Sequence, residues 1–235
     1  MKFTSWNIRG LGSKRKQRLL SNRMKQIAPD VIFIHETKCS IQKIKEIHSK
    51  WLNKFEFLED KAENIVGGIL MLWNPQNIGI INAEASRDYL LVVMQPMGDK
   101  ETYLFTNVYG PQRLYGELKL LDSLQELRER HASIPWILGG DFNMIKYLSK
   151  KKGGTRTLNK DSCAFQSFID NMRLVDIVMS NGTFTWNNKT GGESQVASKL
   201  DRFIISKDLM LKDKDIVARV LPFGDFDHWP VQLEI

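Results

Sequence analysis

The stretch Trp136-Ile137-Leu138-Gly139-Gly140-Asp141-Phe142-Asn143 says most about this chain. Its apolar start predicts a buried strand, and the two glycines leave room for a backbone or a ligand to come close. At strand spacing Asp141 and Asn143 face the same side. An acid and an amide on one side can orient and deprotonate a water molecule. The alternative is an Asx turn, which does not explain the preceding glycines.

Similar apolar runs recur along the chain, rich in β-branched and aromatic residues and bounded by Gly, Pro, Asn or Asp. Such runs predict strands. The predicted strands cover residues 3–6, 31–34, 69–73, 90–94, 103–109, 136–138, 200–205 and 231–235. Between some of them apolar residues take helical spacing. This predicts helices at residues 15–27 and 40–53 and around residues 120–127 and 165–172.

The order of these elements predicts an α/β fold. Helices separate some neighbouring strands and short turns separate others, so parallel and antiparallel pairs are both expected. Two mixed, mostly antiparallel sheets packed face to face, with helices outside, satisfy this pattern. Polar residues at the strand ends would then meet at one edge. No low-complexity linker or repeat interrupts the chain, so we interpret residues 1–235 as one domain. Its ending in a strand pattern suggests a domain cut from a longer chain, and a short natural protein with the same ending is the alternative.

The composition excludes several classes of protein. Of 235 residues 42% are hydrophobic and 26% charged, which rules out a disordered chain. Cys39 and Cys163 are too few for a disulfide framework or a four-thiolate zinc site, and a reducing compartment is expected. No apolar run approaches the ~20 residues of a membrane span, and the N-terminus has no apolar signal core. No membrane partner is therefore expected.

Positive charge is concentrated in two segments. Lys and Arg number 34 against 27 Asp and Glu, a formal net charge of +7. Residues 1–29 hold eight basic side chains and residues 142–160 hold six, with no acid in either segment. A surface of one sign attracts a polyanion, of which DNA and RNA are the commonest. A solvated basic face and a surface for anionic lipid are the alternatives.

Polar residues follow three of the predicted strands. Asn7 either turns the chain or points at a ligand. Glu36 ends an apolar strand, where a carboxylate must be paired or bound to a metal. A hard cation such as Mg²⁺ prefers such an oxygen ligand, and an ion pair with Lys38 is the alternative. Tyr109 either packs before a turn or hydrogen-bonds a phosphate oxygen, and we interpret His35 as a structural neighbour.

Asp201 lies inside an apolar run. Its neighbour Arg202 points to the opposite face, so Asp201 needs a partner elsewhere, and a histidine is suited to this. Asp227 and His228 come just before the last predicted strand. An Asp that keeps His charged would help it stabilise phosphoryl charge. The chain has no nucleophile elbow, P-loop lysine motif or Rossmann glycine pattern, and metal-assisted phosphodiester hydrolysis fits best.

Six motifs in a fixed order carry a family resemblance. They are Ser5-Trp6-Asn7-Ile8-Arg9-Gly10, His35-Glu36-Thr37, Asn107-Val108-Tyr109-Gly110-Pro111, Gly139-Gly140-Asp141-Phe142-Asn143, Lys199-Leu200-Asp201-Arg202-Phe203 and Asp227-His228-Trp229-Pro230. Over nearly the whole chain they resemble the endonuclease/exonuclease/phosphatase superfamily, which includes exonuclease III, the abasic-site endonucleases and DNase I. A closer likeness, to the endonuclease domain of a plant-like non-LTR (LINE-type) retrotransposon, rests on Lys152-Gly153-Gly154, Asn181-Gly182-Thr183-Phe184-Thr185-Trp186 and Ser198-Lys199-Leu200-Asp201-Arg202.

The resemblance implies a four-layer, DNase I-like α/β sandwich that nicks double-stranded DNA with Mg²⁺, or with Mn²⁺ in its place. Glu36 would bind the metal, with Asn7 next to it. Asp141 would activate the attacking water and Asn143 would orient it.

The resemblance also implies how the scissile phosphate is held. Tyr109 and His228 would bind and polarise it, Asp201 would orient His228, and Asp227 would support the metal or that histidine. The products would carry 5′-phosphate and 3′-hydroxyl ends, and in such elements the 3′-hydroxyl primes reverse transcription. A covalently linked reverse transcriptase, action in the nucleus after cytoplasmic synthesis, and a monomeric isolated domain are expected with it.

The basic segments and the resemblance together predict the DNA contacts. They are Arg9, Lys14, Lys150, Lys151, Lys152, Arg156, Thr185, Trp186 and Asn188. We interpret residues 187–198, rich in Asn, Gly and Ser, as a hairpin loop, which in the retrotransposon family enters DNA; a plain turn is the alternative. Target choice would then depend on deformable steps.

Three positions depart from the family pattern. Arg9 stands where abasic-site enzymes have an acidic metal ligand, so metal binding would depend more on Glu36. Phe226 replaces the usual Ser before Asp-His and loses a phosphate hydrogen bond, worth about 1–3 kcal/mol. Ser198 stands where abasic-site enzymes have a pocket-lining tryptophan, which argues against a dedicated repair enzyme.

The leading hypothesis is thus a retrotransposon DNA endonuclease. Three alternatives stay open: an abasic-site repair endonuclease, a superfamily phosphatase acting on lipids or inositol phosphates, and a nucleic-acid-binding module with a weak or dead site. Phe226 is the residue that leaves the last of these open.

Overall fold

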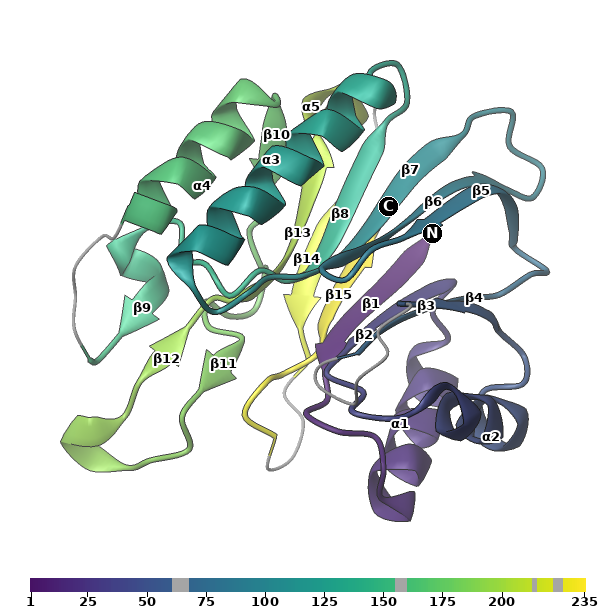
Figure 1. Cartoon of the computed structure of the whole chain (residues 1–235), viewed down its shortest axis with the longest axis horizontal. Helices are drawn as coiled ribbons and strands as arrows, with labels where there is room; N and C mark the ends of the chain where they lie inside the picture. Colours follow the sequence, from purple (N-terminus) through teal and green to yellow (C-terminus); the bar gives the residue numbers. More distant parts are fainter. Residues whose placement is uncertain (61–67, 155–159, 213–214, 222–225) are drawn as a thin grey trace.

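Two six-stranded β-sheets form the centre of the molecule in this computed structural model (Figure 1). The structure describes residues 1–60, 68–154, 160–212, 215–221 and 226–235. The first sheet has the order β14 (Val217–Val220), β15 (Val231–Glu234), β1 (Lys2–Asn7), β2 (Val31–His35), β4 (Ile69–Trp73) and β3 (Glu56–Glu59). The second has the order β10 (Leu174–Asp176), β13 (Asp201–Ser206), β8 (Trp136–Asp141), β7 (Tyr103–Tyr109), β6 (Tyr89–Pro96) and β5 (Ile78–Ala85).

The two sheets share one pattern of strand directions. β1 and β2 run parallel in the first sheet, and β7 and β8 run parallel in the second. The other neighbouring strands described in these sheets pair antiparallel. Each sheet is therefore mixed and mostly antiparallel around one central parallel pair, as the sequence predicted.

Helices cover the outer face of each sheet (Figure 1). α1 (Lys14–Ile27) and α2 (Ile41–Trp51) pack on the first sheet, and α3 (Leu114–Arg130) and α4 (Lys160–Asn171) lie on the second. α5 (Lys207–Met210) is a single turn after β13. Ser13 and Ser40 cap α1 and α2, because each side-chain oxygen accepts a backbone N–H of the first turn.

Three apolar clusters separate these layers. Phe3, Phe33, Phe105 and Phe203 are fully buried and meet between the two sheets. Burying such a ring contributes roughly 1.5–3 kcal/mol. The other two clusters lie between each sheet and its helices. The four-layer α/β sandwich predicted from the sequence is confirmed.

The glycine pair of β8 is explained by this packing. A Cβ on Gly139 would come within 2.4 Å of the Phe203 ring and 2.6 Å of the Phe33 ring. A Cβ on Gly140 would lie 1.9 Å from the carbonyl oxygen of Val108. Of the two options that the sequence left open at these glycines, a close backbone or a close ligand, the structure shows the backbone of Val108 at Gly140, and at Gly139 it shows the rings of the neighbouring strand and the opposite sheet.

The predicted boundaries of helices and strands agree best with the observed ones where the apolar runs are longest. β4 and β7 have the predicted limits, and the four long helices lie where their spacing placed them. The sequence analysis missed β3, β5, β10 and β14, which lie at sheet edges and carry polar residues. It also missed a small third sheet of β11 (Trp186–Asn187), β12 (Ala197–Ser198) and β9 (Lys151–Lys152), next to the short helices η1 (Leu148–Lys150) and η2 (Gly192–Ser194).

The two chain ends meet at the start of β1. β1 pairs antiparallel with β15, the Ile235 N–H donates to the Met1 carbonyl (2.9 Å), and the Met1 amine donates to the Ile235 carbonyl (2.5 Å). Among the described residues no helix has the length and apolarity to cross a membrane.

Candidate active site

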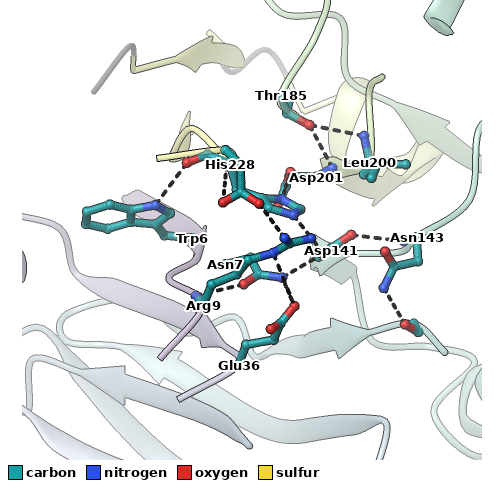
Figure 2. Close-up of polar contacts among 12 residues, drawn as sticks. Trp6, Asn7, Arg9, Glu36, Asp141, Asn143, Thr185, Leu200, Asp201 and His228 are labelled. Atoms are coloured by element: carbon teal, nitrogen blue, oxygen red, sulfur yellow. Dashed lines mark hydrogen bonds and ion pairs between the residues drawn. The ribbon is translucent and has the colours of Figure 1, made fainter. Parts of the chain in front are cut away.

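The carboxyl ends of the two parallel strand pairs bring the predicted polar residues together. Asn7 is in register with His35, the residue before Glu36, and Tyr109 is in register with Asp141. Because parallel strands end at the same edge, these residues share one region between the sheets, where Figure 2 shows Asn7, Glu36 and Asp141 close together. The position of the site thus follows directly from the fold.

Asp141, Asp201 and His228 form the centre of this region, and we call them the buried triad. Their exposed fractions are 0%, 0% and 1%. Asp201 lies opposite Asp141 across the β8–β13 pair, and the His228 Nδ1 is 2.9 Å from the Asp201 Oδ2. The Nε2 of His228 is 3.8 Å from the Asp141 Oδ2. Asp201 therefore has the histidine partner that the sequence predicted.

The triad holds a proton more tightly than free side chains would. Burial disfavours a charged imidazole, but the carboxylates of Asp201 and Asp141 outweigh it and raise the pKa of His228 to about 9. Burial and the charge of Asp201 also raise the pKa of Asp141. His228 is consequently cationic at neutral pH between two carboxylates.

Asn7 connects the two sheets at this point. Its amide nitrogen donates to the Glu36 Oε1 and to the Asp141 Oδ2, each at 2.9 Å. Its carbonyl oxygen accepts the backbone N–H of Arg9 at 3.1 Å. Asn7, predicted to lie near the metal, therefore offers an N–H group to the carboxylates here, while its oxygen is already bonded.

Glu36 and Asp227 lie in a cationic environment, and we call these two the outer carboxylates. The Lys38 Nζ is 2.7 Å from the Glu36 Oε2, and the Arg9 guanidinium is 2.6 Å from Asp227 and 3.8 Å from Glu36. Burial opposes ionisation of Glu36, but its hydrogen bonds from Lys38 and Asn7 lower the pKa of Glu36. The Lys38 ion pair that the sequence left as an alternative is present.

Asn143 reaches the site differently from the prediction. β8 ends at Asp141, and Asn143 takes a left-handed backbone with φ of 54°. Its backbone N–H donates to the Asp141 Oδ1 at 3.0 Å, and its side-chain amide donates to the Gly110 carbonyl at 2.6 Å. The strand-spacing argument was wrong here, and the Asx turn set against it is the observed geometry.

The two histidines of the site are in opposite electrostatic states. His35 is fully buried, and burial lowers the pKa of His35 to about 4. Its Nε2 lies 2.5 Å from the Asn107 Oδ1, and its ring stacks on Tyr109 with centroids 6.1 Å apart. His35 is thus the neutral structural neighbour that the sequence predicted. Burial, together with Glu36 and Asp141, raises the pKa of Tyr109.

The lysines predicted to contact DNA lie on two flanks of the site. Lys14 begins α1 on one flank, and Lys150, Lys151 and Lys152 lie in η1 and β9 on the other (Figure 1). Arg156 lies outside the described residues.

Thr185, Trp186 and Asn188 lie on the β11–β12 side. Thr185 is fully buried, and its hydroxyl accepts the backbone N–H groups of Leu200 and Asp201. The structure places it beneath the site, supporting the Asp201 strand. Trp186 bridges to His228 through the backbone, and Asn188 bonds within the hairpin, which the sequence did anticipate at residues 187–198.

A buried ionic cluster behind the triad was missed by the sequence analysis. Asp176 is 2.7 Å from the Lys199 Nζ and 3.2 Å from the Arg202 guanidinium, and these two cations are 3% and 0% exposed. Arg202 also donates to the Met144 and Lys199 carbonyls. Because Lys199 and Arg202 flank Asp201, the cluster fixes the start of β13. The motif around Asp201 was a usable signal, but no sequence rule pointed to Asp176.

Phe226 has a packing role that sequence comparison did not suggest. Its ring meets the Trp6 ring edge-on at 5.1 Å, and the Lys16 Nζ lies 5.3 Å from its centroid. The Trp6 indole N–H donates to the His228 carbonyl at 3.3 Å. Phe226 and Trp6 therefore support the segment that carries Asp227 and His228.

A family match agrees with this geometry. The model of the Endonuclease/Exonuclease/phosphatase family matches residues 4–223. The chain belongs to this family. Its members are hydrolases that include nucleases and phosphatases and depend on divalent metals, and the three ligand atoms of the buried triad lie within 4.8 Å of one another, close enough to hold a metal ion.

Solved structures with the same fold act on different substrates. The AP endonuclease LMAP from Leishmania major has a TM-score of 0.79 and 16% identity, over 99% of this chain and 86% of that one. The endonuclease domain of TRAS1, a telomere-specific non-LTR retrotransposon, has a TM-score of 0.76 and 12% identity, over 100% of this chain and 97% of that one. A mannosyl-6-phosphatase from Bacteroides thetaiotaomicron has a TM-score of 0.69 and 15% identity, over 100% of this chain and 98% of that one. At these identities the likeness establishes the fold, and the substrate must be argued from the site.

Proposed function

We propose that this protein is a metal-dependent DNA endonuclease of the non-LTR retrotransposon type, which nicks double-stranded DNA and leaves 5′-phosphate and 3′-hydroxyl ends. The observation that carries the proposal is the imidazole of His228 held between the buried carboxylates of Asp201 and Asp141. Hydrolysis of a phosphodiester needs a base for the attacking water and a positive charge near the phosphate, and a poorly solvated carboxylate next to a cation provides both.

Each member of the triad has a distinct task. Asp141, whose pKa is raised by burial and by Asp201, takes the proton of the attacking water. His228 faces the phosphate as a hydrogen-bond donor and stabilises the charge that develops there. Asp201 is a positioning residue that keeps His228 charged. Asn143 is a positioning residue for Asp141 through its backbone N–H.

Tyr109 and Asn7 complete the polar lining of the site. Tyr109 is half-buried at the end of β7, beside Glu36, and its phenol donates to a phosphate oxygen. Asn7 keeps Glu36 and Asp141 a fixed distance apart through its two hydrogen bonds.

The outer carboxylates fit a hard divalent cation best. Glu36 and Asp227 offer oxygen ligands, whereas the imidazole of His228 is already held by Asp201 and lies beside Asp141. Mg²⁺, or Mn²⁺ in its place, would be held by these oxygens. When bound, it would neutralise charge on the scissile phosphate.

Two basic flanks favour DNA over a small phosphate ester. Lys14 on one side and Lys150–Lys152 on the other are positioned to hold a duplex across the site, which a monoester would not need. Ser198 favours the retrotransposon type over abasic-site repair, because it is 4% exposed in β12 and provides no aromatic pocket wall.

The biological setting follows from this assignment. The 3′-hydroxyl of the nick would prime target-primed reverse transcription by a reverse transcriptase in the same polyprotein. The protein would be made in the cytoplasm and act in the nucleus, and the isolated domain would be a monomer.

A supercoiled-plasmid nicking assay tests the proposal. Wild type is incubated with Mg²⁺ or with EDTA, next to Asp141→Ala, His228→Ala and the surface control Asp122→Ala. Nicking that needs Mg²⁺, persists in the control and disappears in both site variants would support the assignment. Nick mapping on plasmid with and without abasic sites then separates the retrotransposon type from repair. A folded wild type that binds DNA and never nicks it would contradict the proposal and favour a binding module.

A further inference from the structure

The outer carboxylates are already occupied by a side chain of the protein. Arg9 lies between them, 2.6 Å from the Asp227 Oδ2 through Nη1 and 3.8 Å from the Glu36 Oε1 through Nε (Figure 2). Lys38 binds the second oxygen of Glu36 at 2.7 Å. Lys16 interacts electrostatically with both carboxylates from α1. Two negative charges thus face three positive ones.

This arrangement is held by the backbone. Arg9, Glu36 and Lys38 each take a left-handed conformation, with φ of 44°, 52° and 50°. For residues other than glycine this costs about 1–2 kcal/mol each. The two loops are joined by the hydrogen bond from the Gly10 N–H to the Glu36 carbonyl, at 2.6 Å. Backbone strain at three charged residues that contact one another indicates that the surrounding fold holds them in place, which a chance surface ion pair would not require.

A metal ion and Arg9 need the same oxygens. A metal ion at about 2.0–2.6 Å from the Asp227 Oδ2 would compete with the Arg9 guanidinium, which is 2.6 Å from that oxygen, while the Asp227 Oδ1 accepts the backbone N–H of His228. The Glu36 and Asp227 side chains are 8% and 18% exposed, so they have little freedom to offer a metal a second face. The Arg9 side chain is 43% exposed and can move toward solvent.

We propose that Arg9 is a tethered counter-ion that competes with the divalent metal for Glu36 and Asp227, so that a metal binds there only after Arg9 has moved aside. The inference rests on the proposed function in one respect, that a divalent cation is the ligand of these carboxylates. A displaced guanidinium would lie on the basic surface that faces DNA, where a phosphate is its natural new partner. Metal entry and DNA binding would then favour each other.

Direct metal binding without DNA tests this competition. The free Mn²⁺ concentration is measured by electron paramagnetic resonance during titration of wild type, Arg9→Gln, Lys25→Gln and Arg9→Gln/Glu36→Gln. Lys25→Gln removes the same charge from the last turn of α1, away from the site. Gln keeps the backbone preference of Arg, and circular dichroism with thermal unfolding verifies that each variant is folded.

The expected result is a dissociation constant for Mn²⁺ at least ten-fold lower in Arg9→Gln than in wild type, a gain lost in the double variant. Mn²⁺ should also raise the melting temperature of Arg9→Gln more than that of wild type. Equal affinity in wild type and Arg9→Gln, an equal gain in Lys25→Gln, or no Mn²⁺ binding in any variant would overturn the proposal. If Arg9→Gln binds Mn²⁺ more tightly but wild type never nicks DNA, the proposed function fails and this inference stands. If wild type nicks DNA but Arg9→Gln has the same Mn²⁺ affinity as wild type, the proposed function stands and this inference fails.

Discussion

The buried triad and the outer carboxylates balance charge in opposite ways. Asp141 and Asp201 face one imidazolium and have almost no exposure, which leaves the group one negative charge in excess. Glu36 and Asp227 face Arg9, Lys38 and Lys16, which leaves one positive charge in excess at the surface. The inner group therefore holds protons, and the outer group attracts anions. Under the proposed function, a DNA phosphate would be drawn to the outer carboxylates and their cations and would be cleaved at the buried triad.

The largest difference between the two groups is expected from matched Asp→Asn changes. Asp201→Asn removes the carboxylate that keeps His228 charged, so the single-turnover nicking rate should fall about 10²–10⁴-fold, the range typical of acid–base groups. Asp227→Asn should lower it less than ten-fold at saturating Mg²⁺, since Glu36 remains. The rates are measured by quenched-flow nicking of a labelled duplex. Similar losses in both variants would remove the distinction between the groups.

The ionic cluster behind the triad should matter for stability more than any surface pair. Asp176→Asn leaves Lys199 and Arg202 buried without a carboxylate, which should cost about 3–5 kcal/mol of unfolding free energy. Glu101→Gln breaks the exposed pair with Lys212 and should change the free energy of unfolding far less, because water screens this pair. Urea denaturation of both variants gives the comparison, and equal costs would show that the cluster is not needed.

The pH dependence of stability should separate the two histidines. His228 has its pKa raised to about 9, so its contribution is full below pH 6.5 and is lost as the pH rises through 9. His35 has its pKa lowered to about 4, so its contribution is full above pH 6.5 and is lost as the pH falls through 4. Each histidine contributes about 3 kcal/mol at most to the free energy of unfolding through its pKa shift. NMR titration of the ring protons checks both values, and a His228 signal that titrates near pH 6.5 would contradict the triad electrostatics.

The smallest effect is expected at Phe226, which precedes Asp227 of the outer carboxylates and His228 of the buried triad. Phe226→Ser removes the ring contacts with Trp6 and Lys16 and should lower the unfolding free energy by about 1–3 kcal/mol. Phe226→Leu, which keeps apolar volume, is the control and should lose less. Calorimetry measures both, and a more stable Phe226→Ser protein would show that the ring is dispensable.

Much of the fold could be predicted because each long apolar run has one suitable location. The runs at residues 69–73 and 103–109 became β4 and β7 unchanged. The edge strand β5 was missed because Asn82, Glu84 and three small residues hide its alternation. An edge strand needs only one buried face, so its sequence is less constrained.

The site was predictable where a side chain had no local partner, and poorly predictable where it did. Asp201 could not pair with Arg202 across the strand, so a distant histidine followed. Asn143 acts through a local backbone hydrogen bond to Asp141, and Thr185 accepts the backbone N–H groups of Leu200 and Asp201; residue type alone reveals neither role. The reach of Arg9 to Asp227, 218 positions later, depends on how the two loops meet in space.

The meeting of the two chain ends offers a route to re-engineering. Met1 and Ile235 are hydrogen-bonded neighbours at the start of β1, and Met1 is about 20 Å along the strand from Asn7 at ~3.3 Å per residue. A linker of a few residues could join them and make β15 and β1 one continuous hairpin. New ends opened in the η2 turn between β11 and β12 would then leave both six-stranded sheets uninterrupted. Such a circular permutant would present its fusion point on the β11–β12 hairpin, which the proposed function places against DNA, instead of at the far end of β1.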